Sequence, residues 1–100
     1  MAYKRLKIGD LEVEEHLIQY VGFQMAPPPV FFSIVATEEH GKKLENRLKQ
    51  LEKEKALAFY AADGGHQLSG LCNIRNLTVD VDESKAPVLY RINGGLEILH

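Results

Sequence analysis

The stretch that decides the fold is VFFSIVATEEHGKKLENRLKQLEKEKALAFYAA, residues 30–62. An apolar run over residues 30–36 leads into a strongly charged segment, and a second apolar run covers residues 56–62. Short apolar runs rich in aromatic and β-branched residues favour strands, whereas the charged segment has the apolar spacing of a helix. The stretch therefore predicts a strand–helix–strand unit, with the helix over residues 38–54.

The predicted helix has favourable end groups, charge pairs and a narrow apolar stripe. Thr37 is a suitable N-cap residue, and acidic residues follow it where the helix dipole favours them. Glu–Lys pairs at i,i+4 add roughly 0.2–0.5 kcal/mol each; they are Glu38–Lys42, Glu39–Lys43 and Glu45–Lys49. The stripe consists of Leu44, Leu48 and Leu51, so most of the helix surface should face water.

Turn residues divide the rest of the chain into strands. Residues 3–8 alternate, and Gly9-Asp10 suits a tight turn into residues 11–14. Residues 15–23 favour a strand, although a helix with Asp10 as its N-cap remains an alternative. Three consecutive prolines, residues 27–29, predict a rigid extended connection between strands.

The C-terminal third has β character throughout. Asp63-Gly64-Gly65 predicts a turn. Apolar residues occupy even positions before Arg75-Asn76 and odd positions after it, and such a phase shift predicts a bulge or sharp bend there. Asn93-Gly94 predicts a type I′ hairpin turn. We therefore expect one α+β domain over residues 1–100, with a mixed, mostly antiparallel sheet of five to six strands.

Composition describes an ordinary globular protein. The chain has 100 residues, 45% hydrophobic and 26% charged, with a net charge of −2 and one cysteine. One cysteine excludes an intrachain disulfide, and no signal peptide or stretch of ~20 apolar residues is visible. We therefore expect a cytoplasmic protein outside the membrane. Nucleic-acid binding, through the helix or residues 3–7, is the weakest hypothesis because glutamates interleave with the basic residues.

No combination of residues indicates catalysis, a metal or a cofactor. The four histidines are scattered without metal-ligand spacing, and Cys72 reads as a small core residue in a strand. We interpret the acidic group at Asp80, Asp82 and Glu83 as a strand face that is exposed to water. We therefore assign no catalytic residue, no metal site and no cofactor.

One candidate ligand site depends on how the two central strands are arranged. If they are parallel and adjacent, the segments that follow them lie at the carboxyl ends of the strands, where α/β proteins bind ligands. The candidate residues are Thr37, His40, Asp63, Gly64 and His66, and His40 could then face His66. This arrangement would make the protein a small-molecule-binding domain or a small enzyme.

Our leading hypothesis is a non-catalytic structural or interaction protein. Both central strands are apolar on two faces, and one helix with a narrow stripe can cover only part of them. Apolar faces and sheet edges left uncovered in this way are commonly satisfied by another copy or a protein partner. The candidate interface residues are Phe31, Phe59 and Tyr60, and the expected assembly is a homo-oligomer or a complex with a protein partner.

Residues 68–99, LSGLCNIRNLTVDVDESKAPVLYRINGGLEIL, carry a pattern of strands separated by glycine-rich turns. In this pattern the segment, about a third of the chain, loosely resembles small β-rich accessory proteins of phage heads and tails. The resemblance implies assembly by strand pairing and a location on a virion.

Overall fold

The predicted strand–helix–strand unit is present as β4 (Val30–Thr37), α1 (Glu38–Glu52) and β5 (Leu57–Asp63) in a computed structural model that describes residues 3–100. Before it lie β1 (Lys4–Ile8), β2 (Leu11–Val13), a 3-10 turn (Glu15–Leu17) and β3 (Ile18–Phe23). After it lie β6 (His66–Asp82) and β7 (Leu89–Leu99). The strand predicted for residues 15–23 is thus confirmed from Ile18 onward.

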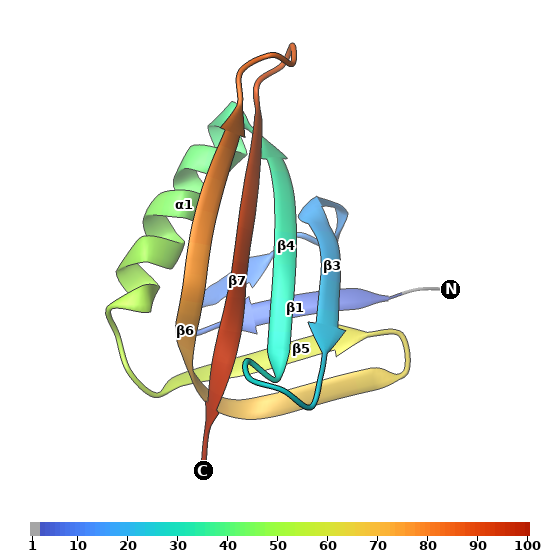
Figure 1. Ribbon diagram of the computed structural model, residues 1–100, viewed down its shortest axis with the longest axis vertical. Coiled ribbons are helices and arrows are strands. Elements are labelled where there is room, and N and C mark those ends of the chain that lie inside the picture. The colour runs from blue at the N-terminus through green and yellow to red at the C-terminus, as the bar shows by residue number, and fades with distance from the viewer. Residues whose placement is uncertain (1–2) are drawn as a thin grey trace.

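The strands form one antiparallel sheet in the order β2-β1-β5-β6-β7-β4-β3, with α1 between β4 and β5 in the chain (Figure 1). The α+β class is confirmed, but the sheet has seven strands rather than five to six, and none of the described strands pair in parallel. Strands β4 and β5 are not neighbours in this sheet, so the parallel crossover considered for residues 30–62 does not form. The cause is β6, which separates them by pairing with β5 through its first half and with β7 through its second.

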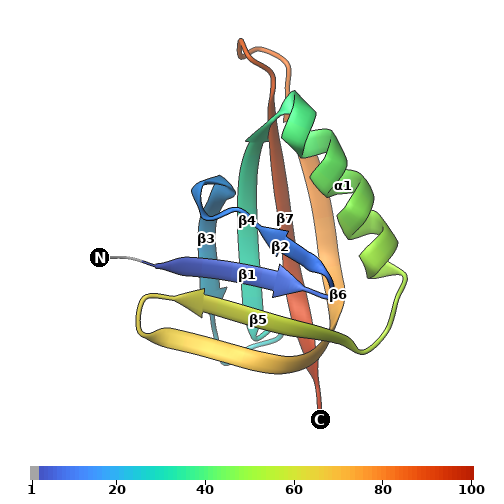
Figure 2. The same ribbon diagram turned by 180° about the vertical axis from the view of Figure 1, so that it is seen from behind.

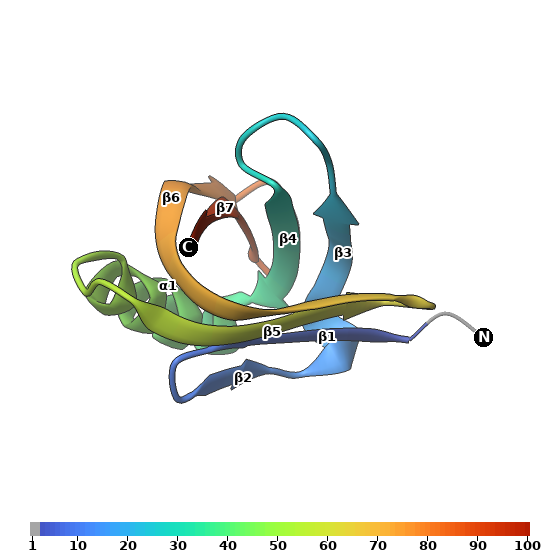
Figure 3. The same cartoon turned by 90° about the horizontal axis from the view of Figure 1, so that it is seen from below.

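The sheet folds over itself because β6 bends. In Figure 2, which shows the molecule from behind, β1 and β5 cross in front of β4 and β7, and the view from below in Figure 3 shows the curved, partly open barrel that results. The pairing of β6 with β7 shifts register between Arg75 and Thr78, and Asn76 has a left-handed φ of 57°. This confirms the predicted bulge, in which one extra residue on β6 increases the local twist and bending. The strand passes from one layer to the other earlier, near Leu71 and Cys72, where its pairing changes from β5 to β7.

The hairpin turn predicted at Asn93-Gly94 is wrong. Both residues lie inside β7, where Asn93 pairs with Ser33 and Gly94 with Phe32 of β4. A Cβ atom at Gly94 would lie 2.8 Å from the Cζ atom of Phe32. The glycine is therefore explained by the close approach of an aromatic ring to a continuous strand, and not by a turn.

The core lies between the two layers, and α1 packs against β4, β6 and β7. The predicted stripe is confirmed, since Leu44, Leu48 and Leu51 are all buried. Thr37 occupies the N-cap position, but its side chain makes no capping hydrogen bond. Two of the predicted ion pairs form, Lys42–Glu38 at 2.9 Å and Lys49–Glu45 at 2.8 Å.

Candidate functional site

The candidate ligand residues fall into two groups on opposite sides of the molecule. Thr37 and His40 lie at the start of α1, whereas Asp63, Gly64 and His66 form the turn between β5 and β6 (Figures 1 and 3). The ring of His66 lies instead near that of Phe23, with 6.4 Å between centroids. The structure therefore does not bring His40 and His66 together, because β4 and β5 are neither parallel nor adjacent.

The three candidate interface residues have different environments. Phe59 is only 4% exposed and belongs to the core, so it offers almost no surface to a partner. Tyr60 is half-buried, donates a hydrogen bond from its hydroxyl to Gln67 Oε1 at 2.7 Å and lies under the guanidinium of Arg5. Phe31 is half-buried on the outer face of β4. Successive side chains of a strand point to opposite faces, and Phe59 lies on the face of β5 that is turned toward the other layer. This position explains why Phe59 is covered.

Cys72 and the acidic group show no chemical activation. Burial raises the pKa of the Cys72 thiol to about 11, which keeps it protonated and unreactive near neutral pH. Hydrogen bonds from Ser84 lower the pKa of the Asp82 carboxyl. Among residues 3–100, no group of three or more His, Cys, Asp or Glu side chains could hold a metal ion.

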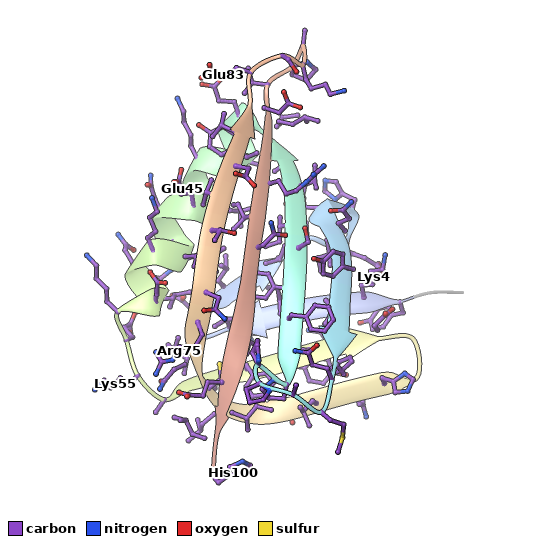
Figure 4. The ribbon with its side chains drawn as sticks, viewed as in Figure 1. Lys4, Glu45, Lys55, Arg75, Glu83 and His100 are labelled. Carbon is purple, nitrogen blue, oxygen red and sulfur yellow. The ribbon has the colours of Figure 1, made fainter. Side chains whose placement is uncertain are left out.

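Exposed apolar side chains gather at one end of the molecule, which we call the open end. It comprises the loop 24–29, the first residues of β6 (66–71) and the last residues of the chain (97–100), all at the lower end of Figure 1. In Figure 4, His100 and Arg75 lie toward this end and Glu83 lies at the other. Three of the six large hydrophobic residues that the structure exposes lie here: Met25 (102%), Leu68 (38%) and Leu71 (48%).

The three prolines form a wall between two hollows at the open end. A hollow of about 380 Å³ is lined by Met25, Ile98 and His100, and one of about 210 Å³ by Arg75 and Asn76. Pro27, Pro29 and Glu97 contribute to both hollows. Proline has no backbone N–H, so this wall offers an incoming group mainly apolar contact.

The proline wall is held in place from both ends. Gln24 donates from its backbone to Pro29 O at 2.9 Å and from its side chain to Pro28 O at 2.8 Å. Pro28 packs on Gly95, where a Cβ atom would lie 2.5 Å from its Cγ atom. Below it, Arg75 and Glu97 form an ion pair at 2.9 Å. A surface that is already ordered loses little entropy on binding.

Sequence reasoning identified the proline connection but missed the surface around it. The hollows need Glu97 and Ile98, which are distant in sequence and reach the prolines only through the pairing of β7 with β4. The available signal is Gly94-Gly95, of which Gly94, with Asn93, is predicted from the sequence to form a turn.

The open end thus combines exposed apolar side chains with an ordered wall of prolines. None of the described helices has the length and apolar character needed to span a membrane. Comparison with protein-family models, with curated proteins and with solved structures found no match.

Proposed function

We propose that this protein is a non-catalytic interaction protein that works by protein–protein association through its open end, with another copy of the chain as the partner. The observation that carries the proposal is that Met25, Leu68 and Leu71 are all exposed at one end of the molecule, where Met25 lines a hollow beside the prolines. Exposed apolar surface concentrated in one region of a soluble protein commonly marks an interaction site. Assembly into a phage particle, as the resemblance of residues 68–99 implies, is one form of this function.

Analytical ultracentrifugation across a wide range of concentration tests the proposal. We expect the wild-type protein to self-associate, and we expect Met25→Lys and Leu71→Lys to weaken the association, because each places a charge in the apolar surface. Val81→Lys is the matched control, since Val81 is 42% exposed on the same strand as Leu71 but lies far from the open end. A wild-type protein that stays monomeric at every concentration would contradict the proposal.

A further inference from the structure

One edge of the sheet at the open end has no partner strand. Residues 66–70 of β6 pair with β5 on one side, but pairing with β7 on the other side begins only at Leu71. Among residues 3–100, no other strand pairs with this edge. The pairing of β6 with β7 thus begins at the Leu71–Leu99 pair, and residues 66–70 of β6 have a partner strand on one side only.

The register of the β5–β6 pairing determines which backbone groups point toward the unpaired edge of β6. Asp63 and His66 close the two-residue turn at Gly64-Gly65, so they form a hydrogen-bonded pair. Hydrogen-bonded and non-bonded pairs alternate along an antiparallel ladder, so Leu68 and Gly70 direct their N–H and C=O groups toward β5. Gln67 and Ser69 therefore direct theirs away from β5, toward the unpaired edge.

The other edges of the sheet are shortened, distorted or covered. Strand β2 has only three residues, and β3 carries a bulge between Ile18 and Tyr20. Lys4 Nζ donates to the Gln19 carbonyl at 3.1 Å and so occupies an acceptor of the β3 edge. Helix α1 packs against β6. These are the features by which proteins block unwanted strand addition.

The edge at residues 66–71, HQLSGL, lacks all of these features. It contains no Asp, Glu, Lys or Arg, and its central Leu68 is 38% exposed. Because the segment is uncharged, two copies of it can meet without electrostatic repulsion. A neutral, partly apolar edge favours addition of a strand from another chain.

We infer that two copies of this chain associate by antiparallel pairing of their β6 edges, residues 66–70, about a two-fold axis at Leu68. Gln67 of one copy then pairs with Ser69 of the other, and the reverse, so that roughly four backbone hydrogen bonds cross the interface. The two Leu68 side chains meet at the axis as a non-bonded pair, the arrangement with the closer side-chain approach.

The side chains of the segment fit this register. The pairing places His66 opposite Gly70 of the other copy, where the missing side chain leaves room for an imidazole. One position further along, the Gly64-Gly65 turn of one copy lies against the end of β7 of the other copy. Within each copy, nothing lies within 4 Å of a Cβ atom placed at either glycine. Bulky residues at the turn or at position 70 would obstruct this approach.

The strand-pairing proposal rests on the proposed self-association and specifies how the two copies are arranged. Two kinds of measurement are therefore needed to test the association and the arrangement separately. The first uses ultracentrifugation of two edge variants. Ser69→Pro removes an outward N–H and leaves the β5–β6 hydrogen bonds in place, while Leu68→Lys puts a charge at the axis. We expect each to raise the dimer dissociation constant by about tenfold or more. Val81→Lys should leave it unchanged, with circular dichroism confirming that all three variants fold.

The second measurement is amide hydrogen exchange of the wild-type protein at low and high concentration. We expect exchange at Gln67 and Ser69 to slow as dimer forms, while the amides of Leu68 and Gly70, bonded to β5, stay protected throughout. Dimers that persist in both edge variants, or outward amides that exchange equally fast at both concentrations, would overturn strand pairing. If Met25→Lys still weakens those dimers, association through the open end stands. A wild-type monomer at every concentration would overturn both.

Discussion

At the residue scale, Gly41 shows how packing can reverse an intrinsic preference. A glycine inside a helix destabilises it by about 1 kcal/mol relative to alanine, so the sequence alone suggests that alanine would improve α1. In the structure Gly41 is buried, and a Cβ atom there would lie 2.5 Å from both Cβ and Cγ of Tyr90. These atoms are close to the β7 backbone and cannot easily move aside, so the glycine fixes how near α1 approaches the sheet.

Gly41→Ala should therefore destabilise the protein, with a net loss of about 1–2 kcal/mol in the free energy of unfolding, because overpacking exceeds the gain in helix propensity. Urea denaturation followed by circular dichroism measures this loss. Asn46→Ala, at an exposed position of the same helix, is the control and should be neutral or stabilising by about 0.5 kcal/mol. Equal stabilisation by both substitutions would show that α1 can move away from Tyr90 at little cost.

At the element scale, β6 decides the architecture because it pairs with both layers, and its bulge contains one residue in an uncommon conformation. Asn76 has a φ of 57°, a region that asparagine tolerates and β-branched residues avoid. Asn76→Val should lower the free energy of unfolding by about 1–2 kcal/mol. Asn76→Gly should change it by less than about 0.5 kcal/mol, because glycine adopts this conformation without strain. Thermal and urea unfolding check both values, and a harmless valine would mean that the bulge can relocate.

Strands β6 and β7 also show which structural features could be predicted from the sequence and which could not. The bulge at Arg75-Asn76 was predictable because a phase shift in the apolar pattern is a local signal. The glycines of β7 carry an equally clear local signal for a turn, yet Phe32 and Pro28, which explain them, come from β4 and the loop before it. Turn signals and close-packing glycines look alike in a sequence, so only the tertiary neighbours distinguish them.

The same limit applies to the candidate site. Phe59 and Leu68 are both apolar residues of predicted strands, but Phe59 is 4% exposed and Leu68 is 38% exposed. The difference depends on how far each layer of the folded sheet extends over the other. That overlap follows from the bend of β6. Composition and periodicity alone therefore could not distinguish apolar residues of the core from apolar residues of the surface.

At the scale of the whole molecule, a single core joins the helix to both layers of the sheet. Leu48 is fully buried and belongs to the same cluster as Phe32 of β4 and Ile74 of β6. The Asp10 carboxylate, in the turn between β1 and β2, also forms an ion pair with Arg47 of α1. Because α1 is held by its narrow stripe, by the close contact of Gly41 with Tyr90 and by this ion pair, we expect the helix to have no stability apart from the sheet.

Leu48→Ala should therefore lower the free energy of unfolding of the entire protein, by about 2–5 kcal/mol, rather than loosen α1 alone. Helical circular dichroism and the near-ultraviolet signal of the tyrosines should lose their native values at the same urea concentration in both proteins. Lys43→Ala, at an exposed position of α1, is the control and should change stability by less than about 0.5 kcal/mol. A helical signal that disappears before the tyrosine signal would show instead that the sheet folds without α1, and that the barrel keeps its shape by strand pairing alone.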